Sequence, residues 1–146
     1  MTLALTACGR LTVMPPPEGE PVVLKPAELA TTWTDYSDGT LTLKQDGTFI
    51  ANKVCVAVGW HDGLAWSGTG TWEPVTGTWQ QDRDKKQSFL DVTFDTAHSY
   101  DDYYPEGERR PDSYAALRHG KVLKLWAPVG DPDNDYPNCV LTSPAS

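Results

Sequence analysis

Apolar and polar residues alternate with a period of two along most of this chain. Residues 40–44 have the sequence Thr-Leu-Thr-Leu-Lys, and residues 48–51 have the sequence Thr-Phe-Ile-Ala. Asp46 and Gly47 between them are preferred residues for a tight turn, so the two segments predict a hairpin. Alternate side chains of a strand share one face, which here is expected to be buried and consists of Leu41, Leu43, Phe49 and Ala51.

The same pattern predicts about eight to nine short strands in close succession. Besides the hairpin, the expected strands cover residues 32–36, 67–73, 77–81, 88–94, 113–118, 122–127 and 136–141. A short helical turn is expected only at 26–30, where proline is acceptable in a first turn. Short strands joined by local hairpins favour an all-β fold, namely an antiparallel up-and-down meander closed into a barrel. A two-sheet sandwich is the alternative.

The predicted strand at 67–73 has two glycines on the face that is expected to point inward. Gly68 and Gly70 share that face with Trp72, whereas polar residues alternate on the wet face. The missing side chains leave room that is either filled by a large neighbour such as Trp33 or kept as a cavity for a guest. The segment is not a phosphate-binding loop, because no helix follows to present amide groups.

Residues 5–9, Leu-Thr-Ala-Cys-Gly, resemble the lipobox at which bacterial lipoprotein precursors are lipidated on cysteine and then cleaved. Cys8 would be the lipidated residue. A signal peptide needs a basic start and roughly 7–15 apolar residues, so we expect residues 1–7 to be a truncated signal peptide whose start lies upstream. The alternative is a chance match in a cytosolic protein.

A proline-rich segment follows Cys8. Prolines at 15–17, 21 and 26 disfavour a helix or an interior strand, so residues 8–27 are expected to be the lipidated cysteine and a stiff tether. The tether would hold a barrel domain at residues 28–142 off a membrane, and residues 143–146 would be a tail. We therefore expect a protein anchored by lipid to the extracytoplasmic face of the cell membrane. An ordinary disordered N-terminus is the alternative.

The chain has three cysteines, an odd number for an exported protein. With Cys8 assigned to lipid, Cys55 and Cys139 remain as a pair that an oxidising compartment would join. Such a bridge closes a large loop and would stabilise the fold by roughly 4–5 kcal/mol in the chain-entropy model. Two buried free thiols in a cytosolic protein are the alternative.

Length and charge narrow the classes of function. The 146 residues allow one domain after the leader and tether, and the net charge of −8 argues against a nucleic-acid partner. Acidity also argues against adhesion to anionic lipid by charge, so the lipid on Cys8 would have to provide the anchor. No run of about 20 apolar residues occurs, so we expect no transmembrane helix.

Patterns for catalysis and metal binding are weak. His61, His98 and His119 show neither HxH nor HExxH spacing, and Ser67 lacks a GxSxG elbow. Residues 131–135, Asp-Pro-Asp-Asn-Asp, look like half of a calcium loop, but Tyr136 stands where glycine is required. We therefore expect no enzyme activity, no cofactor and no metal site.

A set of short motifs is distributed over the predicted strands and turns. They are Trp33, residues 38–43 (Asp-Gly-Thr-Leu-Thr-Leu), 46–49 (Asp-Gly-Thr-Phe), 68–72 (Gly-Thr-Gly-Thr-Trp), 125–126 (Leu-Trp) and 130–133 (Gly-Asp-Pro-Asp). Together they resemble a family of secreted or lipoprotein β-domains of Gram-positive bacteria, broadly lipocalin-like. The resemblance covers roughly residues 28–142 and implies a barrel but no particular chemistry. One feature differs from lipocalins, since Thr31 stands where glycine usually precedes the first-strand tryptophan.

The connection at residues 95–112 is the best candidate for a contact surface. It is unusually long for a compact barrel and is rich in tyrosine. Tyrosine offers a large rigid area with a polar tip, which suits sugars, peptides or a partner protein. The candidate contact residues are Tyr100, Tyr103, Tyr104, Arg109 and Arg110, with Trp60 and Trp126 as additional members.

The sequence therefore predicts a non-enzymatic cell-envelope lipoprotein whose lipocalin-like barrel binds a small apolar molecule or a surface component such as an envelope protein. The alternative is a protein-interaction or inhibitor module with a solid-packed barrel and contacts through the 95–112 loop. An apolar interior cavity would favour the first function, and a packed interior would favour the second.

Overall fold

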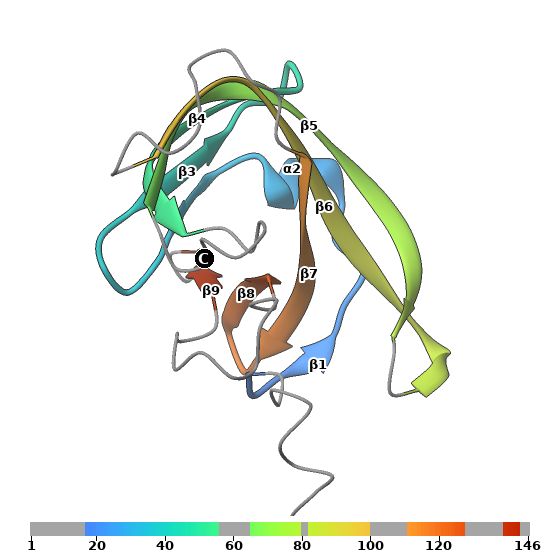
Figure 1. Cartoon of the computed structure of the whole chain (residues 1–146). Coiled ribbons are helices and arrows are strands. Elements are labelled where there is room, and N and C mark those ends of the chain that lie inside the picture. Colours follow the sequence, from blue (N-terminus) through green and yellow to red (C-terminus); the bar gives the residue numbers. More distant parts are fainter. Residues whose placement is uncertain (1–16, 56–64, 80–81, 100–110, 128–138, 144–146) are drawn as a thin grey trace, which may run out of the picture.

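The computed structural model describes residues 17–55, 65–79, 82–99, 111–127 and 139–143 (Figure 1). One sheet of nine strands dominates these residues, and a single helical turn accompanies it. The elements are β1 (Glu20–Pro21), α2 (Pro26–Leu29), β2 (Thr32–Thr34), β3 (Thr40–Leu43), β4 (Thr48–Cys55), β5 (Ala65–Trp79), β6 (Asp82–Ser99), β7 (Pro111–His119), β8 (Val122–Ala127) and β9 (Cys139–Thr142).

The sheet closes on itself into an eight-stranded antiparallel barrel. Each strand from β2 to β8 pairs with the next strand along the chain, and β9 pairs back with β2. The predicted all-β, up-and-down meander is therefore confirmed. β1 is an extra strand, in which Glu20 pairs with Arg118 of β7. The seam between β2 and β9 is short, with one residue pair formed by Thr34 and Thr142.

The β5–β6 hairpin is longer than the sequence pattern predicts. Segments predicted separately at 67–73 and 77–81 belong to one strand, and Pro74 pairs with Leu90 in the ladder. Proline is tolerated there because the β4–β5 ladder ends at Thr71, so no described strand pairs with that edge of β5 beside Pro74. The prediction of two strands is wrong, and the long hairpin projects past the barrel (Figure 1).

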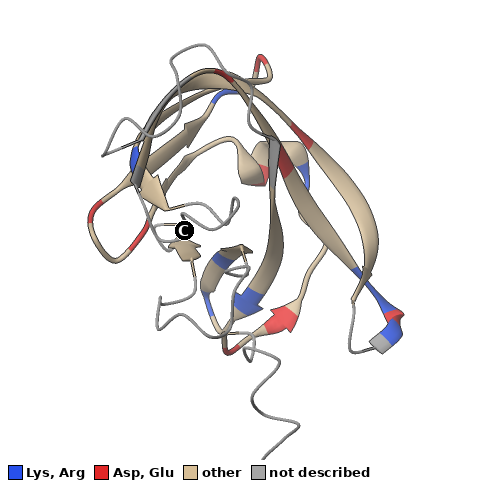
Figure 2. Ribbon diagram, viewed as in Figure 1, with Lys and Arg blue, Asp and Glu red and all other residues tan. Residues whose placement is uncertain are grey.

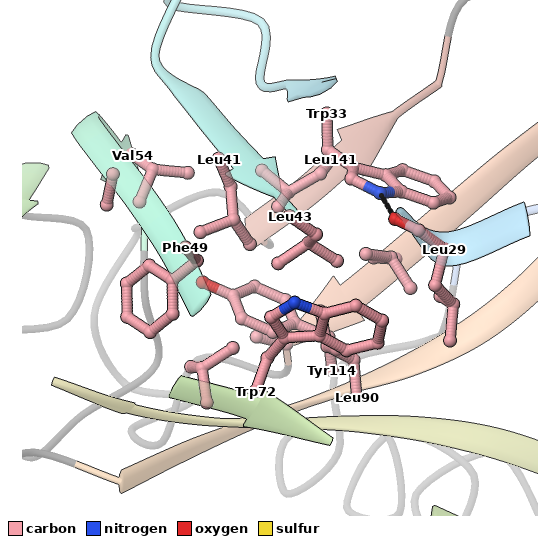
Figure 3. Close-up of a cluster of buried hydrophobic side chains, with 14 of the residues drawn as sticks. Leu29, Trp33, Leu41, Leu43, Phe49, Val54, Trp72, Leu90, Tyr114 and Leu141 are labelled. Atoms are coloured by element: carbon pink, nitrogen blue, oxygen red, sulfur yellow. Dashed lines mark hydrogen bonds between the residues drawn. The ribbon is translucent and has the colours of Figure 1, made fainter. Parts of the chain in front are cut away.

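Side chains from every strand of the ring pack in one core (Figure 3). The predicted buried face of the first hairpin is confirmed, since its four members are each at most 4 % exposed. The ring of Phe94 contacts the rings of Phe49 and Trp66 edge-on, with centroids 5.0 and 5.5 Å apart. The largest fully buried side chains of the core are Trp33, Trp66, Tyr114, Phe49 and Phe94.

The room beside the glycines of β5 is filled by an aromatic ring. Gly70 is buried, and the ring of Phe49 on β4 occupies the space that its missing side chain leaves. The sequence suggested Trp33 as the residue that fills this room, but at Gly70 the residue is Phe49. Trp72 is buried on the same face, and its Nε1 donates a 2.8 Å hydrogen bond to the carbonyl oxygen of Lys44.

Residues 22–24, which lead from β1 to α2, contact both β6 and β7. The Val22 amide donates to the Ala116 carbonyl (3.3 Å), and the Ser88 amide donates to the Val22 carbonyl (2.9 Å). Leu24 is buried, and its amide donates to the Ser88 hydroxyl (2.7 Å). Residues 20–24 of the expected tether thus pack on the barrel, because their backbone groups find partners there.

The predicted helical turn is confirmed as α2, which lies within the ring of strands in Figure 1. Leu29 is fully buried, and its carbonyl oxygen accepts a 2.9 Å hydrogen bond from Nε1 of Trp33 (Figure 3). The helix therefore closes one end of the barrel. Within the described ranges, we find no helix with the length and apolarity needed to cross a membrane.

Candidate functional site

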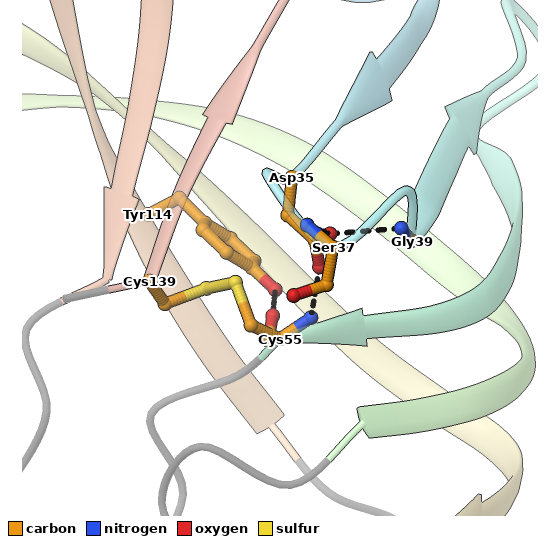
Figure 4. The surroundings of a disulfide bond; sticks show 6 residues. All are labelled: Asp35, Ser37, Gly39, Cys55, Tyr114 and Cys139. Carbon is orange, nitrogen blue, oxygen red and sulfur yellow. Dashed lines mark hydrogen bonds between the residues drawn. A yellow bond between two sulfur atoms is a disulfide. The ribbon is translucent and has the colours of Figure 1, made fainter. Parts of the chain in front are cut away.

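A disulfide bond joins Cys55, at the end of β4, to Cys139, at the start of β9 (Figure 4). The sulfur atoms are 2.11 Å apart and the Cα atoms 5.5 Å apart. The predicted pairing is confirmed. The two strands are not neighbours, since β3 and β2 lie between them in the ring, so the bond spans the short β2–β9 seam.

A buried carboxylate organises the turn beside this bond. Asp35 is 7 % exposed, and its Oδ1 accepts hydrogen bonds from the amides of Ser37 (2.9 Å) and Gly39 (2.8 Å). Its Oδ2 accepts a third bond from the amide of Cys55 (3.0 Å). One side chain thus ties the β2–β3 turn to the end of β4, as Figure 4 shows.

Tyr114 adds a contact from the opposite side of the barrel. Its hydroxyl, on β7, donates a 2.9 Å hydrogen bond to the carbonyl oxygen of Cys55 (Figure 4). Both backbone polar groups of Cys55 are therefore satisfied by side chains, one from Asp35 and one from Tyr114. We call Asp35, Tyr114 and the Cys55–Cys139 bond the clasp. Its role is structural, because both oxygens of the Asp35 carboxylate already accept hydrogen bonds from backbone amides.

The clasp lies at one end of the barrel, which we call the disulfide end. In an up-and-down meander alternate connections leave from the same end, so the β2–β3 turn shares this end with three other connections. These three connections follow β4, β6 and β8. The two segments in which the sequence places contact residues are therefore attached at the same end, beside the clasp.

Most of the predicted contact residues lie outside the described residues. They are Trp60, Tyr100, Tyr103, Tyr104, Arg109 and Arg110. Cys8 of the lipobox and residues 131–135 also lie outside them. The described strand ends that flank the contact residues, Cys55, Ala65, Ser99 and Pro111, belong to the disulfide end.

Trp126 corrects one expectation from the sequence. It is 7 % exposed and therefore offers little area to a partner. It packs with Ala115 and Leu117 on the outer face of the sheet, where Trp79 and Phe89 of the long hairpin also pack. The sequence pattern places Trp126 outward, but the β5–β6 hairpin supplies apolar neighbours from far along the chain, so the residue is buried.

The outer face of β5 and β6 carries a shallow open depression of about 250 Å³. Glu73 and Asp91 stand directly opposite each other in the ladder, and the hydroxyl of Ser113 donates to Asp91 at 3.0 Å. The depression is polar, which does not suit an apolar guest. In the described part of the chain, no group of three or more histidine, cysteine, aspartate or glutamate residues is placed to hold a metal ion.

The titratable groups with a resolved shift do not suggest a nucleophile. Partial desolvation, and then the charge of Asp35, raise the pKa of Tyr36 above its usual value. His119 lies in the β7–β8 turn region, where its Nε2 is 3.6 Å from a carboxylate oxygen of Glu18. His61 and the side chain of His98 lie outside the described residues.

Sequence reasoning missed the clasp residues Asp35 and Tyr114. A signal for Asp35 was present, since aspartate followed by serine and glycine in a short turn is typical of a side chain that accepts backbone amides. The Asp38-Gly39 pair is a second signal, because both are preferred turn residues. In the structure a Cβ atom at Gly39 would lie 2.6 Å from a carboxylate oxygen of Asp35. Tyr114 has no comparable local signal.

Comparison with known proteins does not assign the chain to a family. No protein-family model, no curated protein and no solved structure matches the chain.

Proposed function

We propose that this protein is a non-enzymatic domain, anchored by lipid on Cys8 to the extracytoplasmic face of a cell membrane, that binds another envelope component through its disulfide end. The observation that supports surface binding is the aromatic core. Trp33, Trp66 and Tyr114 are each at most 1 % exposed and belong to one packed cluster with the rings of Phe49 and Phe94. Those rings occupy the space in which a barrel of this kind would hold a ligand.

A carrier of small apolar molecules is the second candidate, and the core weighs against it. Ligand pockets typically have about 300–1,000 Å³ and predominantly apolar walls. The glycines of β5 leave space for a ligand inside the barrel, but at Gly70 the ring of Phe49 fills this space. The depression on the outer face is polar and holds about 250 Å³.

The disulfide end supplies a suitable platform for a surface contact. The clasp fixes the β2–β3 turn, the end of β4 and the start of β9 relative to one another. Residues 35–39, 56–64, 95–112 and 128–138 contain twelve of the twenty Asp and Glu but two of the twelve Lys and Arg. The partner that suits such a platform presents a basic surface, because opposite charges accelerate association and select the partner.

Replacement of the lipobox cysteine tests the anchoring. In the full-length precursor, Cys8→Ala should move the protein from the membrane fraction to the medium, because stable attachment requires the acyl chains. Cys55→Ala serves as the control, because it removes a different cysteine and should leave the remaining protein in the membrane fraction. Unchanged fractionation of Cys8→Ala would refute the lipid anchor.

Native mass spectrometry separates the two functions. A contact module should give the mass of the processed, acylated chain alone after gentle purification from its host. A stoichiometric apolar guest that survives buffer exchange would instead establish the carrier function.

A further inference from the structure

The end of the barrel opposite the disulfide end has a charge that the net value conceals. The tip of the β5–β6 hairpin and the β7–β8 turn bring together six cationic residues, which we call the basic end. Figure 2 shows their blue segments at the hairpin tip and around β7 and β8, close to β1. The residues of the basic end are Arg83, Lys85, Lys86, Arg118, Lys121 and Lys124.

Contacts around β1 bring three of these residues, Lys85, Arg118 and Lys124, together. Lys85 pairs with Glu20 at 3.2 Å, and Glu20 is the ladder partner of Arg118. The Lys124 ammonium donates a 3.0 Å hydrogen bond to the carbonyl oxygen of Glu18. The hairpin tip and the β7–β8 turn therefore flank the point at which the chain enters the barrel.

The charges are segregated along the barrel. The helix α2 and the β3–β4 turn lie at the same end of the barrel as the six cations, and Glu28 of α2 is 4.0 Å from Arg118. With their residues Lys25, Lys44, Glu28 and Asp46 included, this end holds eight cations against six carboxylates in the sequence. The rest of the described chain holds one lysine against six carboxylates. The connections at the disulfide end add most of the remaining acidic residues. The protein is thus a dipole with a cationic pole where the chain enters and an anionic pole at the clasp.

We infer that the basic end is a docking surface for the anionic head groups of a lipid bilayer, an inference that rests on the proposed anchoring at Cys8. Eight residues lie between Cys8 and Pro17, where the described structure begins. A fully extended chain of that length spans at most about 30 Å, so an acylated protein stays close to the bilayer. The chain enters at the basic end, and this end is therefore the one that faces the membrane.

Electrostatics act on this geometry in one direction. An anionic leaflet attracts cations and repels carboxylates within about 8 Å at physiological salt. The basic end is drawn to the surface, while the acidic disulfide end is turned toward the medium, where it is free to meet a partner. Net charge alone hides this effect, because the acidic residues that outnumber the cations lie at the far pole.

Vesicle binding by a chain without lipid tests the inference. The full chain with Cys8→Ala should bind vesicles that contain phosphatidylglycerol more tightly than vesicles of phosphatidylcholine alone, and high salt should abolish the difference. Adding Lys86→Gln and Lys121→Gln should weaken binding at least about tenfold, since each cation near an anionic surface contributes severalfold to the affinity. Lys86 and Lys121 are exposed, so neither change disturbs the core.

Lys53→Glu is the matched control. It lowers the net charge by two units, as the double change does, but Lys53 lies near the end of β4, at the disulfide end. Its effect on binding should be less than about twofold, because the residue lies beyond the screening distance from the membrane. Equal weakening by the two variants would show that net charge alone acts, and equal binding to both kinds of vesicle would overturn the inference. Preference for a nucleic acid over the vesicles would also overturn it.

Amine labelling of the acylated protein gives a second readout. On vesicles with phosphatidylglycerol, Lys86 and Lys121 should be protected from a water-soluble acylating reagent, while Lys53 remains reactive. Equal reactivity of the three lysines would refute the orientation. The vesicle assay uses the Cys8→Ala chain and so does not depend on the anchor, whereas the fractionation of Cys8→Ala tests the anchor alone. The two proposals can therefore fail separately.

Discussion

Gly70 and Phe49 face each other across the β4–β5 ladder with no space for another atom between them. They are register partners, and a Cβ atom built at Gly70 would lie 2.8 Å from Cε2 of Phe49 and 2.0 Å from the carbonyl oxygen of Thr93. The second contact involves backbone on β6, which no rotamer change relieves. Glycine is therefore required at this position by the approach of two neighbouring strands.

Gly70→Ala should destabilise the barrel by about 3 kcal/mol, the upper part of the usual range for an overpacked core. Gly77→Ala is the control on the same strand, because there the new Cβ would meet only the ring of Phe89, which is partly exposed and can move. Its cost should stay below about 1 kcal/mol. Urea denaturation of both variants measures the difference, and similar midpoints would contradict the packing described for Gly70.

Asp35→Asn should cost about 2–4 kcal/mol of unfolding free energy. The carboxylate accepts three backbone amides, whereas the amide side chain offers one acceptor oxygen and turns a second donor toward the remaining N–H groups. Asp38→Asn makes the same chemical change in the same turn and should be nearly neutral. Asp38 is exposed with a φ of 67°, a conformation that asparagine adopts readily. Thermal melts that shift equally for both variants would show that the Asp35 network contributes little.

Most strands could be predicted from the sequence because their alternation is a local pattern, and the disulfide could be predicted from the number of cysteines. The alternation around Leu41 and Leu43 is a property of one segment, and two cysteines remained once Cys8 was set aside. The continuation of β5 through Pro74 was not predictable, because it depends on where the neighbouring strand ends. Residue propensity alone predicts that the strand is interrupted at Pro74.

The candidate site was less accessible to sequence reasoning, because its contacts join distant residues. Asp35 and Cys55 are twenty residues apart, and Tyr114 lies fifty-nine residues beyond Cys55. The burial of Trp126 likewise depends on Phe89, from a hairpin whose length the pattern underestimates. The separation of charge between the two ends of the barrel could be recognised only from the topology. Net charge does not show from which end of the barrel each connection leaves.

Asp46→Asn should make the protein less sensitive to acid. The hydroxyl and amide of Thr48 donate to the carboxylate at 2.6 and 2.9 Å, and the hydroxyl contributes most to holding the pKa of Asp46 below its usual value. A lowered pKa means that this stabilisation is present at neutral pH and is lost as pH falls through the folded-state value, below about pH 4. Thr48→Val, which removes the stronger donor, should weaken the same dependence. An unchanged slope of unfolding free energy against pH in both variants would contradict this role.

Removal of the disulfide should produce the largest loss of stability. Cys55 and Cys139 are 84 residues apart, and a loop of that size corresponds to about 4–5 kcal/mol in the chain-entropy model. The effect should be close to this limit because the bond spans the β2–β9 seam, where one residue pair holds the strands together. Cys55→Ser combined with Cys139→Ser should lower the urea midpoint by the same amount as a thiol reductant lowers it in the parent chain. The double variant itself should not respond to the reductant, and a parent protein whose midpoint is unaffected by reduction would show that the hydrogen bonds of Asp35 and Tyr114 suffice to close the barrel.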